Sequence, residues 1–313
     1  MAYQQNGRVA GFVAVNKGTV EGCATNVLFR EKSGGAGFVF ENQGKINSSV
    51  AIRCVKGKNG KGFYYRNAGT IGNSAYLAPD NMRMAGSNGQ ILYRAGNPEL
   101  FLSSATSPEL VYRRLALEKV WEKPARSNPF ALEPDIATNH VRLLPAGKNV
   151  TTISTPAELQ QVIAAVNAGD RDAASANYRL VGDLNMKGAS LAPLGLSESR
   201  PFTGTFDGNG MVISNFKIPC KGLEFGGFFG YTKNAKVANL TVDYLLRGAG
   251  GIISGGMVGC ADGGLFNNCH VRAGMTPGLC TGGFAGKNTG TLKNCYVCGK
   301  LSAPVSPLPF AVC

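Results

Sequence analysis

Short apolar stretches alternate with glycine-rich turns in two parts of this chain. In "TGGFAGKNTGTLKNCYVCGK" (residues 281–300), an apolar pair follows two glycines, and an Asn-x-Gly turn precedes a second apolar run. The same layout recurs in "GGMVGCADGGLFNNCHVRAG", "GGFFGYTKNAKVANLTVDY" and "AGFVAVNKGTVEGCAT". Alternation of apolar and polar residues over two to five positions between turns is a strand signal. The pattern therefore predicts short strands joined by tight turns.

The glycine before each apolar pair gives the period of the repeat. The anchors are 26 and 25 residues apart in the first part and 29 and 27 apart in the last part: Gly11, Gly37 and Gly62, then Gly227, Gly256 and Gly283. No repeat contains a helical pattern, which excludes leucine-rich, ankyrin and tetratricopeptide architectures. The repeats predict an all-β chain whose units are coils of a parallel β-helix, stacked about 4.8 Å apart.

Equivalent residues of stacked coils should form columns. Apolar columns are expected to fill the interior, and a polar column is expected to form a side-chain amide ladder from Ser48, Asn73, Asn239, Asn268 and Asn294. Cys23, Cys269 and Cys295 fall in one inward column. We interpret them as small buried side chains, a common role for cysteine.

The repeats resemble the GLUG motif, a short glycine-rich repeat of bacterial surface proteins and of non-catalytic parts of IgA-specific peptidases and filamentous adhesins. "PFTGTFDGNGMVISNFKI" (residues 201–218), followed by "GGFFGY", is similar to the stretch that opens GLUG solenoids. The resemblance covers residues 150–300 well and 7–79 moderately. It implies a right-handed parallel β-helix of the pectate-lyase-like type and an extracellular or cell-surface location, and it says little about activity.

A helix is predicted just before the second set of repeats. Thr155 and Glu158 form a capping box, Pro156 occupies the first helical position, and Gly169 can end the helix. An apolar stripe runs along one side: Leu159, Val162, Ile163 and Val166. Such a helix would cover the open end of a solenoid, which is otherwise a bare sheet edge.

These patterns divide the chain into five parts. They are β-helix coils over 1–79, a connector over 80–150 with a short helix at 107–121, a capping helix and lead strand over 151–199, β-helix coils over 200–304, and a proline-rich tail over 305–313. The first solenoid segment lacks a starting cap. Three explanations stay open: the chain is a fragment of a longer protein, the N-terminal coils stack on another part of the same fold, or open ends pair between molecules.

Charge favours an anionic partner. The chain has a net charge of +13, which the sequence distributes evenly: residues 1–79 carry a net +7 and residues 200–313 a net +6. Acidic polysaccharide or another protein chain is favoured over nucleic acid, because no run of four basic residues occurs. The candidate contacts for an anionic ligand are Arg247, Arg272 and Lys300.

No catalytic, cofactor-binding or metal-binding set is predicted. The nine cysteines are an odd number, which argues against a disulfide-stapled scaffold, and the two histidines lie outside any zinc motif. His270 follows Cys269 directly, so the two side chains should point to opposite faces of a strand. Asp207 is interpreted as a turn residue, and Asp243 and Asp262 fall at different coil positions, so no carboxylate pair is evident. No membrane span and no signal peptide are predicted.

The leading hypothesis is a non-enzymatic structural or adhesion module of a bacterial or phage-like surface or secreted protein, whose basic outer face contacts anionic glycans or other chains. One alternative is a polysaccharide lyase or glycoside hydrolase of the pectate-lyase-like fold. The other is a filament subunit that self-associates through open solenoid ends.

Overall fold

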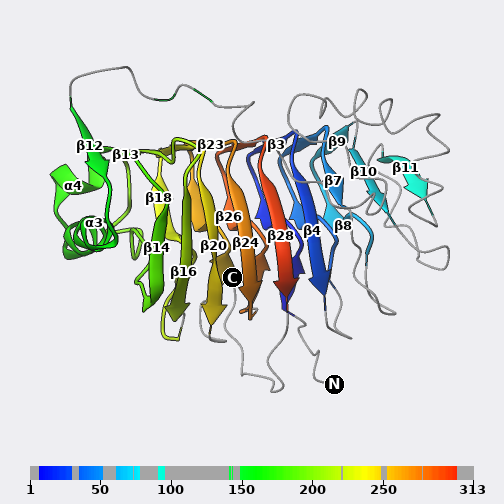
Figure 1. The fold of residues 1–313 in the computed structure, drawn as a ribbon. Helices are drawn as coiled ribbons and strands as arrows, with labels where there is room; N and C mark the ends of the chain where they lie inside the picture. Colours follow the sequence, from blue (N-terminus) through cyan, green and yellow to red (C-terminus); the bar gives the residue numbers. More distant parts are fainter. Residues whose placement is uncertain are drawn as a thin grey trace.

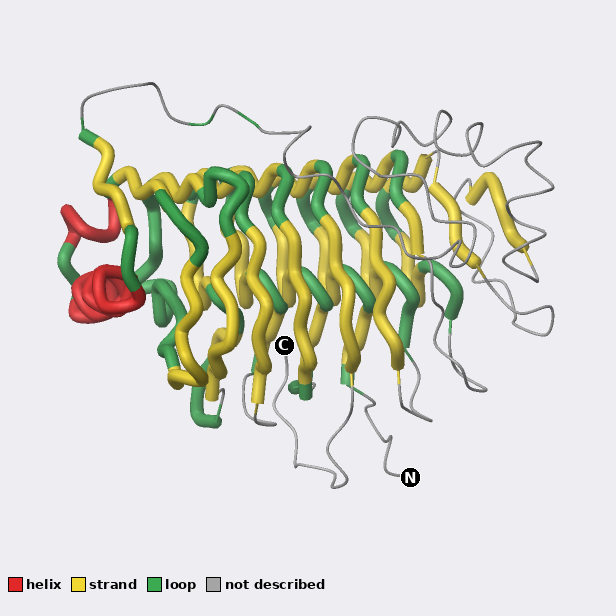
Figure 2. The backbone as a smooth tube through the Cα atoms, in the orientation of Figure 1, coloured by secondary structure: helices red, strands yellow, loops and turns green. Residues whose placement is uncertain are grey.

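The structure, a computed structural model, describes residues 7–29, 35–51, 61–72, 74–77, 91–95, 141, 143, 149–219, 221–247, 252–276 and 278–301. In this part of the chain the strands stack into a parallel β-helix with a helical cap at one end (Figures 1 and 2). The predicted fold class is therefore confirmed.

Four parallel sheets form the walls of the solenoid, and we number them I to IV. Sheet I contains β1 (Arg8–Ala10), β25 (Cys280–Gly282), β21 (Ile253–Gly255) and β17 (Phe225–Gly226), in spatial order. Sheet II contains β18 (Phe229–Lys233), β22 (Val258–Asp262), β26 (Ala285–Asn288), β2 (Val13–Asn16), β5 (Val39–Asn42) and β8 (Tyr64–Asn67).

The two larger sheets extend along the whole described stack. Sheet III contains β12 (Val150–Ile153), β13 (Asn177–Leu180), β15 (Thr205–Asp207), β19 (Lys236–Ala238), β23 (Leu265–Asn267), β27 (Thr291–Lys293), β3 (Thr19–Glu21), β6 (Lys45–Asn47) and β9 (Thr70–Gly72). Sheet IV contains β14 (Leu184–Ser190), β16 (Val212–Pro219), β20 (Thr241–Arg247), β24 (His270–Met275), β28 (Tyr296–Leu301), β4 (Ala24–Phe29), β7 (Val50–Ala51), β10 (Ser74–Leu77) and β11 (Ile91–Ala95).

The N-terminal coils continue directly from the last C-terminal coil. In Figure 1 the blue strand β4 lies beside the red strand β28, and their register runs from Tyr296 opposite Ala24 to Leu301 opposite Phe29. β2 pairs with β26 and β3 with β27 in the same way. The two solenoid segments of the sequence are therefore one stack in space. This stacking accounts for the missing N-terminal cap without a second molecule.

An aromatic row fills the interior on both sides of this join. The rings of Phe284 and Phe12 stack with centroids 5.2 Å apart, those of Phe12 and Phe38 at 4.8 Å, and those of Phe38 and Phe63 at 4.6 Å. All four side chains are fully buried or nearly so. Each ring contributes burial and offset stacking to its neighbour, so the interior of the N-terminal coils is completed only by the C-terminal coil.

The anchor glycines permit the close approach of neighbouring coils. A Cβ atom on Gly11 would overlap the carbonyl oxygen of Gly37, and one on Gly283 would overlap the carbonyl oxygen of Gly11. Real Cβ atoms do not occupy such positions. The glycine that defines the repeat in the sequence is therefore fixed by backbone contact across the stack.

The predicted capping helix is confirmed. α3 (Pro156–Ala168) begins after Thr155, whose hydroxyl accepts the Glu158 amide at 3.3 Å, while the Glu158 carboxylate accepts the Thr155 amide at 3.0 Å. Gly169 ends the helix in the left-handed conformation. The short α4 (Arg171–Ser175) follows. The buried stripe of α3 packs on the core at the end of the stack: Leu159, Ile163 and Val166.

Several predictions fall outside the described residues. These are the helix at 107–121, most of the connector over 80–150 and the proline-rich tail over 305–313.

Candidate functional site

A continuous amide ladder runs through the turns between sheets II and III. Asn288 Nδ2 donates to Asn16 Oδ1 at 2.9 Å, Asn16 Nδ2 to Asn42 Oδ1 at 2.8 Å, and Asn42 Nδ2 to Asn67 Oδ1 at 2.7 Å. These are the asparagines of the Asn-x-Gly turns. The ladder passes through the join, so it links the coil at 280–301 to three N-terminal coils.

The polar column that the sequence assigned to an amide ladder behaves differently. Asn239, Asn268 and Asn294 occupy the left-handed region with φ of 55°, 53° and 51°, a conformation that asparagine tolerates better than most residues. Asn268 Nδ2 donates to Asn239 Oδ1 at 3.1 Å. Gly22 occupies the next rung after Asn294, so no amide continues the row there. Ser48 has φ of 49° in the same column, and Asn73 lies outside the described residues.

The three inward cysteines lie in one column and use their thiols as hydrogen-bonding groups. Cys23 Sγ donates to the Glu21 carbonyl at 3.2 Å, and Cys295 Sγ to the Lys293 carbonyl at 3.1 Å. The Cys295 amide in turn donates to Cys23 Sγ at 3.4 Å. Cys269 Sγ contacts the Asn267 carbonyl at 3.4 Å. All three are fully buried and free.

Burial decides the reactivity of Cys295. It raises the pKa of the Cys295 thiol well above its usual value, and the neighbouring Cys23 and Cys269 thiols act in the same direction. Thiolate is the nucleophilic form of cysteine. Cys295 is therefore held in its unreactive protonated form.

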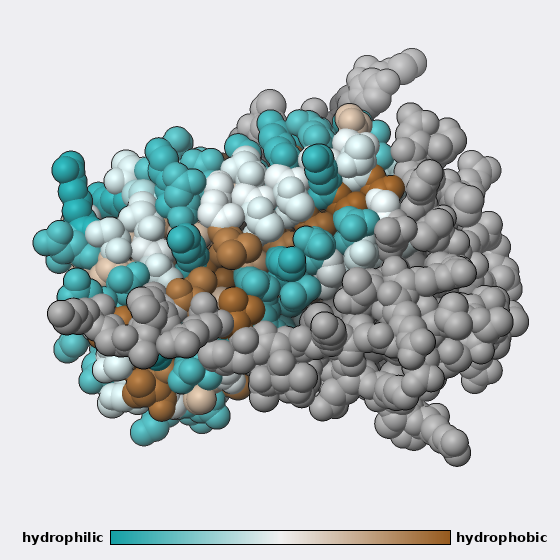
Figure 3. All heavy atoms as spheres, turned by 90° about the horizontal axis from the view of Figure 1, so that it is seen from above, coloured by the Kyte–Doolittle hydropathy of each residue, from teal (hydrophilic) through white to brown (hydrophobic). Residues whose placement is uncertain are grey.

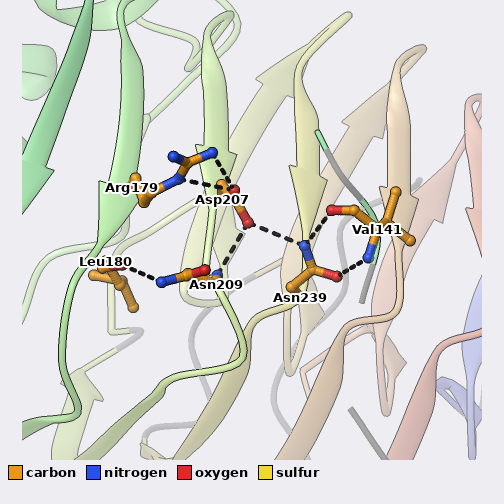
Figure 4. A network of polar contacts seen from close by, with 6 residues as sticks. All are labelled: Val141, Arg179, Leu180, Asp207, Asn209 and Asn239. Carbon is orange, nitrogen blue, oxygen red and sulfur yellow. Dashed lines mark hydrogen bonds and ion pairs between the residues drawn. The ribbon is translucent and has the colours of Figure 1, made fainter. Parts of the chain in front are cut away.

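The buried carboxylate of Asp207 lies near the capped end of the stack (Figure 4). Asp207 Oδ2 accepts from Arg179 Nε at 3.1 Å and is 3.1 Å from Arg179 Nη2, with the Asp207 side chain 1% exposed. Its Oδ1 accepts from the Asn209 amide and from Asn239 Nδ2, both at 3.0 Å. Both carboxylate oxygens are thus occupied by donors, and the group forms a buried ion pair with Arg179.

The same network fastens the connector to the solenoid. Asn239 Nδ2 donates to the Val141 carbonyl at 2.7 Å, and the Val141 amide donates to Asn239 Oδ1 at 2.8 Å. The Asn239 side-chain amide thus makes the two hydrogen bonds to the Val141 backbone that a neighbouring strand would make. Sequence reasoning treated Asp207 as a turn residue and missed this role, because Arg179, Asp207 and Val141 are far apart in the chain. Nothing in the local sequence "FDGNG" indicates that Arg179, one coil away, pairs with Asp207.

His270 lies beside the cysteine column but on the outer side of β24. Its side chain is 3% exposed, and within the described chain Nε2 has no hydrogen-bond partner. Burial, with a smaller contribution from the Arg272 charge, lowers its pKa to about 3. Its ring meets Tyr296 edge-on at 6.2 Å. Nothing among the described contacts pairs His270 with a cysteine.

A second polar cluster lies on the outer side of sheet II. Tyr231 Oη donates to Asp262 Oδ2 at 3.1 Å, and Thr289 Oγ1 is 3.2 Å from Asp262 Oδ1. Cys260 packs with Tyr231 and Phe225. Burial raises the pKa of the Cys260 thiol to about 12. This thiol is therefore also protonated at neutral pH.

The three predicted anion contacts all fall on sheet IV, in different columns. Arg272 is exposed and lies opposite Asp243 and Cys298 in the register. Lys300 lies opposite Gly274, and Arg247 opposite Pro219. The side chains of Arg247 and Lys300 lie outside the described part of the structure. The register therefore brings no two of the three residues into one column.

Comparison with known proteins returned no match among protein-family models, curated proteins or solved structures. Among the described residues no group of three or more His, Cys, Asp or Glu side chains is arranged to hold a metal ion. Neither described helix is long and apolar enough to span a bilayer.

Proposed function

We propose that this chain is a non-enzymatic β-helix module, with a structural or adhesive role in a surface or secreted protein, and that its basic outer face contacts anionic glycans. The resemblance to GLUG repeats belongs to the same proposal. The observation that carries it is the use of the polar side chains inside the stack. The thiols of Cys23 and Cys295, the turn amides and the Asp207 carboxylate all bond to neighbouring coils or to their own turns.

A scaffold of this kind presents its remaining charges on a regular outer surface. The net charge of +13 attracts polyanions at low and moderate ionic strength. Successive coils place outward residues at a repeat of about 4.8 Å. A module that binds a linear polysaccharide without cleaving it needs charges presented along the length of the bound polymer.

The test is a binding and turnover assay on the same samples. The full chain is incubated with polygalacturonate, hyaluronate and alginate, and neutral dextran serves as the control polymer. We expect the protein to bind the acidic polymers, and we expect these polymers to gain no new unsaturated or reducing ends. Accumulation of such ends would favour the lyase or hydrolase alternative, and failure to retain any acidic polymer would overturn the glycan-binding role.

A further inference from the structure

Charge is distributed unevenly along the axis of the stack. We call residues 149–264 the cap half, and the described residues of 7–77 together with 265–301 the distal half. The cap half carries nine basic and nine acidic residues, and the distal half nine basic and two acidic residues. The even distribution between residues 1–79 and 200–313 thus does not extend along the axis, because the N-terminal coils extend the stretch at 265–301, which has no acidic residue.

Basic side chains of the distal half gather at the turn from sheet II into sheet III and along the short strands of sheet III. Each of four consecutive coils contributes at least one, and we call this set the basic corner: Lys287 and Lys293, then Lys17, then Lys45, then Arg66. Lys17, Lys45 and Arg66 are exposed, and Lys287 and Lys293 are half-buried. The rise between neighbouring coils is about 4.8 Å, so the corner extends about 14 Å along the axis.

The two acidic residues near this corner are already engaged. Glu21 Oε2 lies 3.6 Å from Lys293 Nζ across the join. Glu41 Oε2 lies 3.7 Å from Arg8 Nη1, and its Oε1 accepts from Gln43 Nε2 at 2.6 Å. Within the described chain, Lys17, Lys45 and Arg66 form no ion pair. Their charges are available to a partner, and exposed charges of this kind act mainly through long-range attraction.

Hydroxyl groups flank the charges. Thr291, Thr19, Lys45 and Thr70 occupy one column of sheet III. Figure 3 shows the molecule from above, the side where Figure 1 places β3, β9 and β23: hydrophilic side chains are spread over this face, with a narrow hydrophobic band between them. Threonine hydroxyl groups beside cations on successive coils suit a chain that carries both hydroxyl and anionic groups.

An acidic polysaccharide fits this surface better than a nucleic acid does. Single-stranded nucleic acids bind through a series of aromatic platforms on which successive bases stack. Among the described residues, the stacked outer pair near the corner is Phe40 and Tyr65, whose rings lie 4.5 Å apart and cover each other, with Phe40 only 7% exposed. Among the described residues the columns of the corner offer cations and hydroxyl groups and no row of free rings.

We infer that a linear acidic polysaccharide binds along the solenoid axis over the basic corner of the distal half, with the cap half contributing little. The inference rests on the proposed function, because it names the surface and ligand class of the proposed glycan contact. It also replaces the contact set expected from the sequence, since the corner lies on sheets II and III and Arg247, Arg272 and Lys300 lie on sheet IV.

The test compares two variants of the full chain with equal loss of charge. The distal variant is K17Q/K45Q/R66Q, and the matched control is K217Q/K233Q/K236Q, which removes three exposed cations from the cap half. Binding of polygalacturonate and hyaluronate is measured at about 0.05 and 0.15 M salt, with a single-stranded oligonucleotide as competing probe. Circular dichroism and thermal unfolding check that both variants are folded.

We expect the distal variant to bind the polysaccharides roughly 10-fold or more weakly and with a smaller salt dependence, and the control to change by less than about 2-fold. Equal weakening of both variants would overturn the assignment to the distal half while leaving the proposed function intact. Tighter binding of the oligonucleotide than of either polysaccharide would overturn the ligand class. No polysaccharide binding by the unaltered chain would instead overturn the proposed function itself.

Discussion

The N-terminal and C-terminal coils fill the same columns with different residues. The interior row that holds Met257 in one C-terminal coil holds Phe12, Phe38 and Phe63 in the N-terminal coils. The turn column that holds Ala261 in that same coil holds Asn16, Asn42 and Asn67 in the N-terminal coils. The interior position therefore accepts more than one large apolar side chain, and the turn position does not require an amide side chain in every coil.

Among the described C-terminal coils, the coil at 280–301 contacts the N-terminal coils directly. It lies in the C-terminal part of the sequence, yet it carries Phe284 and Asn288 where the N-terminal coils have phenylalanine and asparagine. Both residues are buried and match the residues that they contact in the coil that follows in space. A solenoid gains stability mainly through nearest-neighbour interfaces, so matched rows at this contact place the two segments in one cooperative stack.

The largest effect is expected from removing the ring at the centre of the join. Phe12→Ala leaves a cavity between Phe284 and Phe38 and should cost about 3–5 kcal/mol of unfolding free energy. This loss of unfolding free energy is measured by denaturant unfolding, monitored with probes in both solenoid segments. If the C-terminal coils kept their full stability while only the N-terminal coils unfolded, the two segments would not form one cooperative unit.

Acid should destabilise the C-terminal coils through His270. Its pKa is lowered to about 3 in the folded chain, against an ordinary value of 6.5, so the unfolded chain binds the extra proton between these values. Stability should therefore fall as pH drops below about 6.5 and level off near 3, with a loss of about 3 kcal/mol at pH 4 relative to pH 7.

The matched variant is His270→Gln, which keeps His140 and every carboxylate. Its unfolding free energy should lack the component of the pH dependence between pH 6.5 and 4 that the unaltered chain shows. Identical pH profiles for the two proteins would mean that His270 is not the group responsible.

A smaller effect is expected within the amide ladder. Asn16→Ala removes the acceptor of Asn288 and the donor to Asn42, both inside the stack, and should cost about 2–3 kcal/mol. Asn67→Ala, at the partly exposed end of the same ladder, should cost about 1 kcal/mol. Thermal and denaturant unfolding of the pair measure the difference, and equal costs would show that the ladder does not act through the join.

The smallest effect is expected from exchanging sulfur for oxygen in the inward column. Ser49 Oγ donates to the Asn47 carbonyl at 2.9 Å, as Cys23 Sγ does to Glu21, and it accepts the Cys23 amide at 3.3 Å. Cys23→Ser keeps both kinds of bond and should change stability by no more than about 1 kcal/mol. Cys23→Val, which keeps the apolar bulk and loses the bonds, is the comparison, and it should be the more damaging of the two.

The sequence predicted what depends on neighbours within a coil. The capping box at Thr155 and Glu158 and the end of the helix at Gly169 are local patterns, and the structure confirms them. The period of the anchor glycines was enough to predict the fold class. The predicted amide column contains the bond from Asn268 to Asn239, but the continuous ladder lies in the Asn-x-Gly turns. Asn239, Asn268 and Asn294 also share a left-handed backbone, a requirement that looks the same in the sequence as an amide row.

The order of the coils in space was decided only by the tertiary structure. Repeats of one period can stack on either neighbour, so the sequence left three explanations open for the uncapped N-terminal coils. The choice came from rows that meet across the join, such as Phe284 on Phe12 and Asn288 on Asn16, which are more than 270 residues apart. The ion pair of Arg179 with Asp207, the hold on Val141 and the separation of charge along the axis follow from that stacking. The sequence by itself thus determined the coil, and contacts between distant segments determined how the coils are assembled and where the outer charges gather.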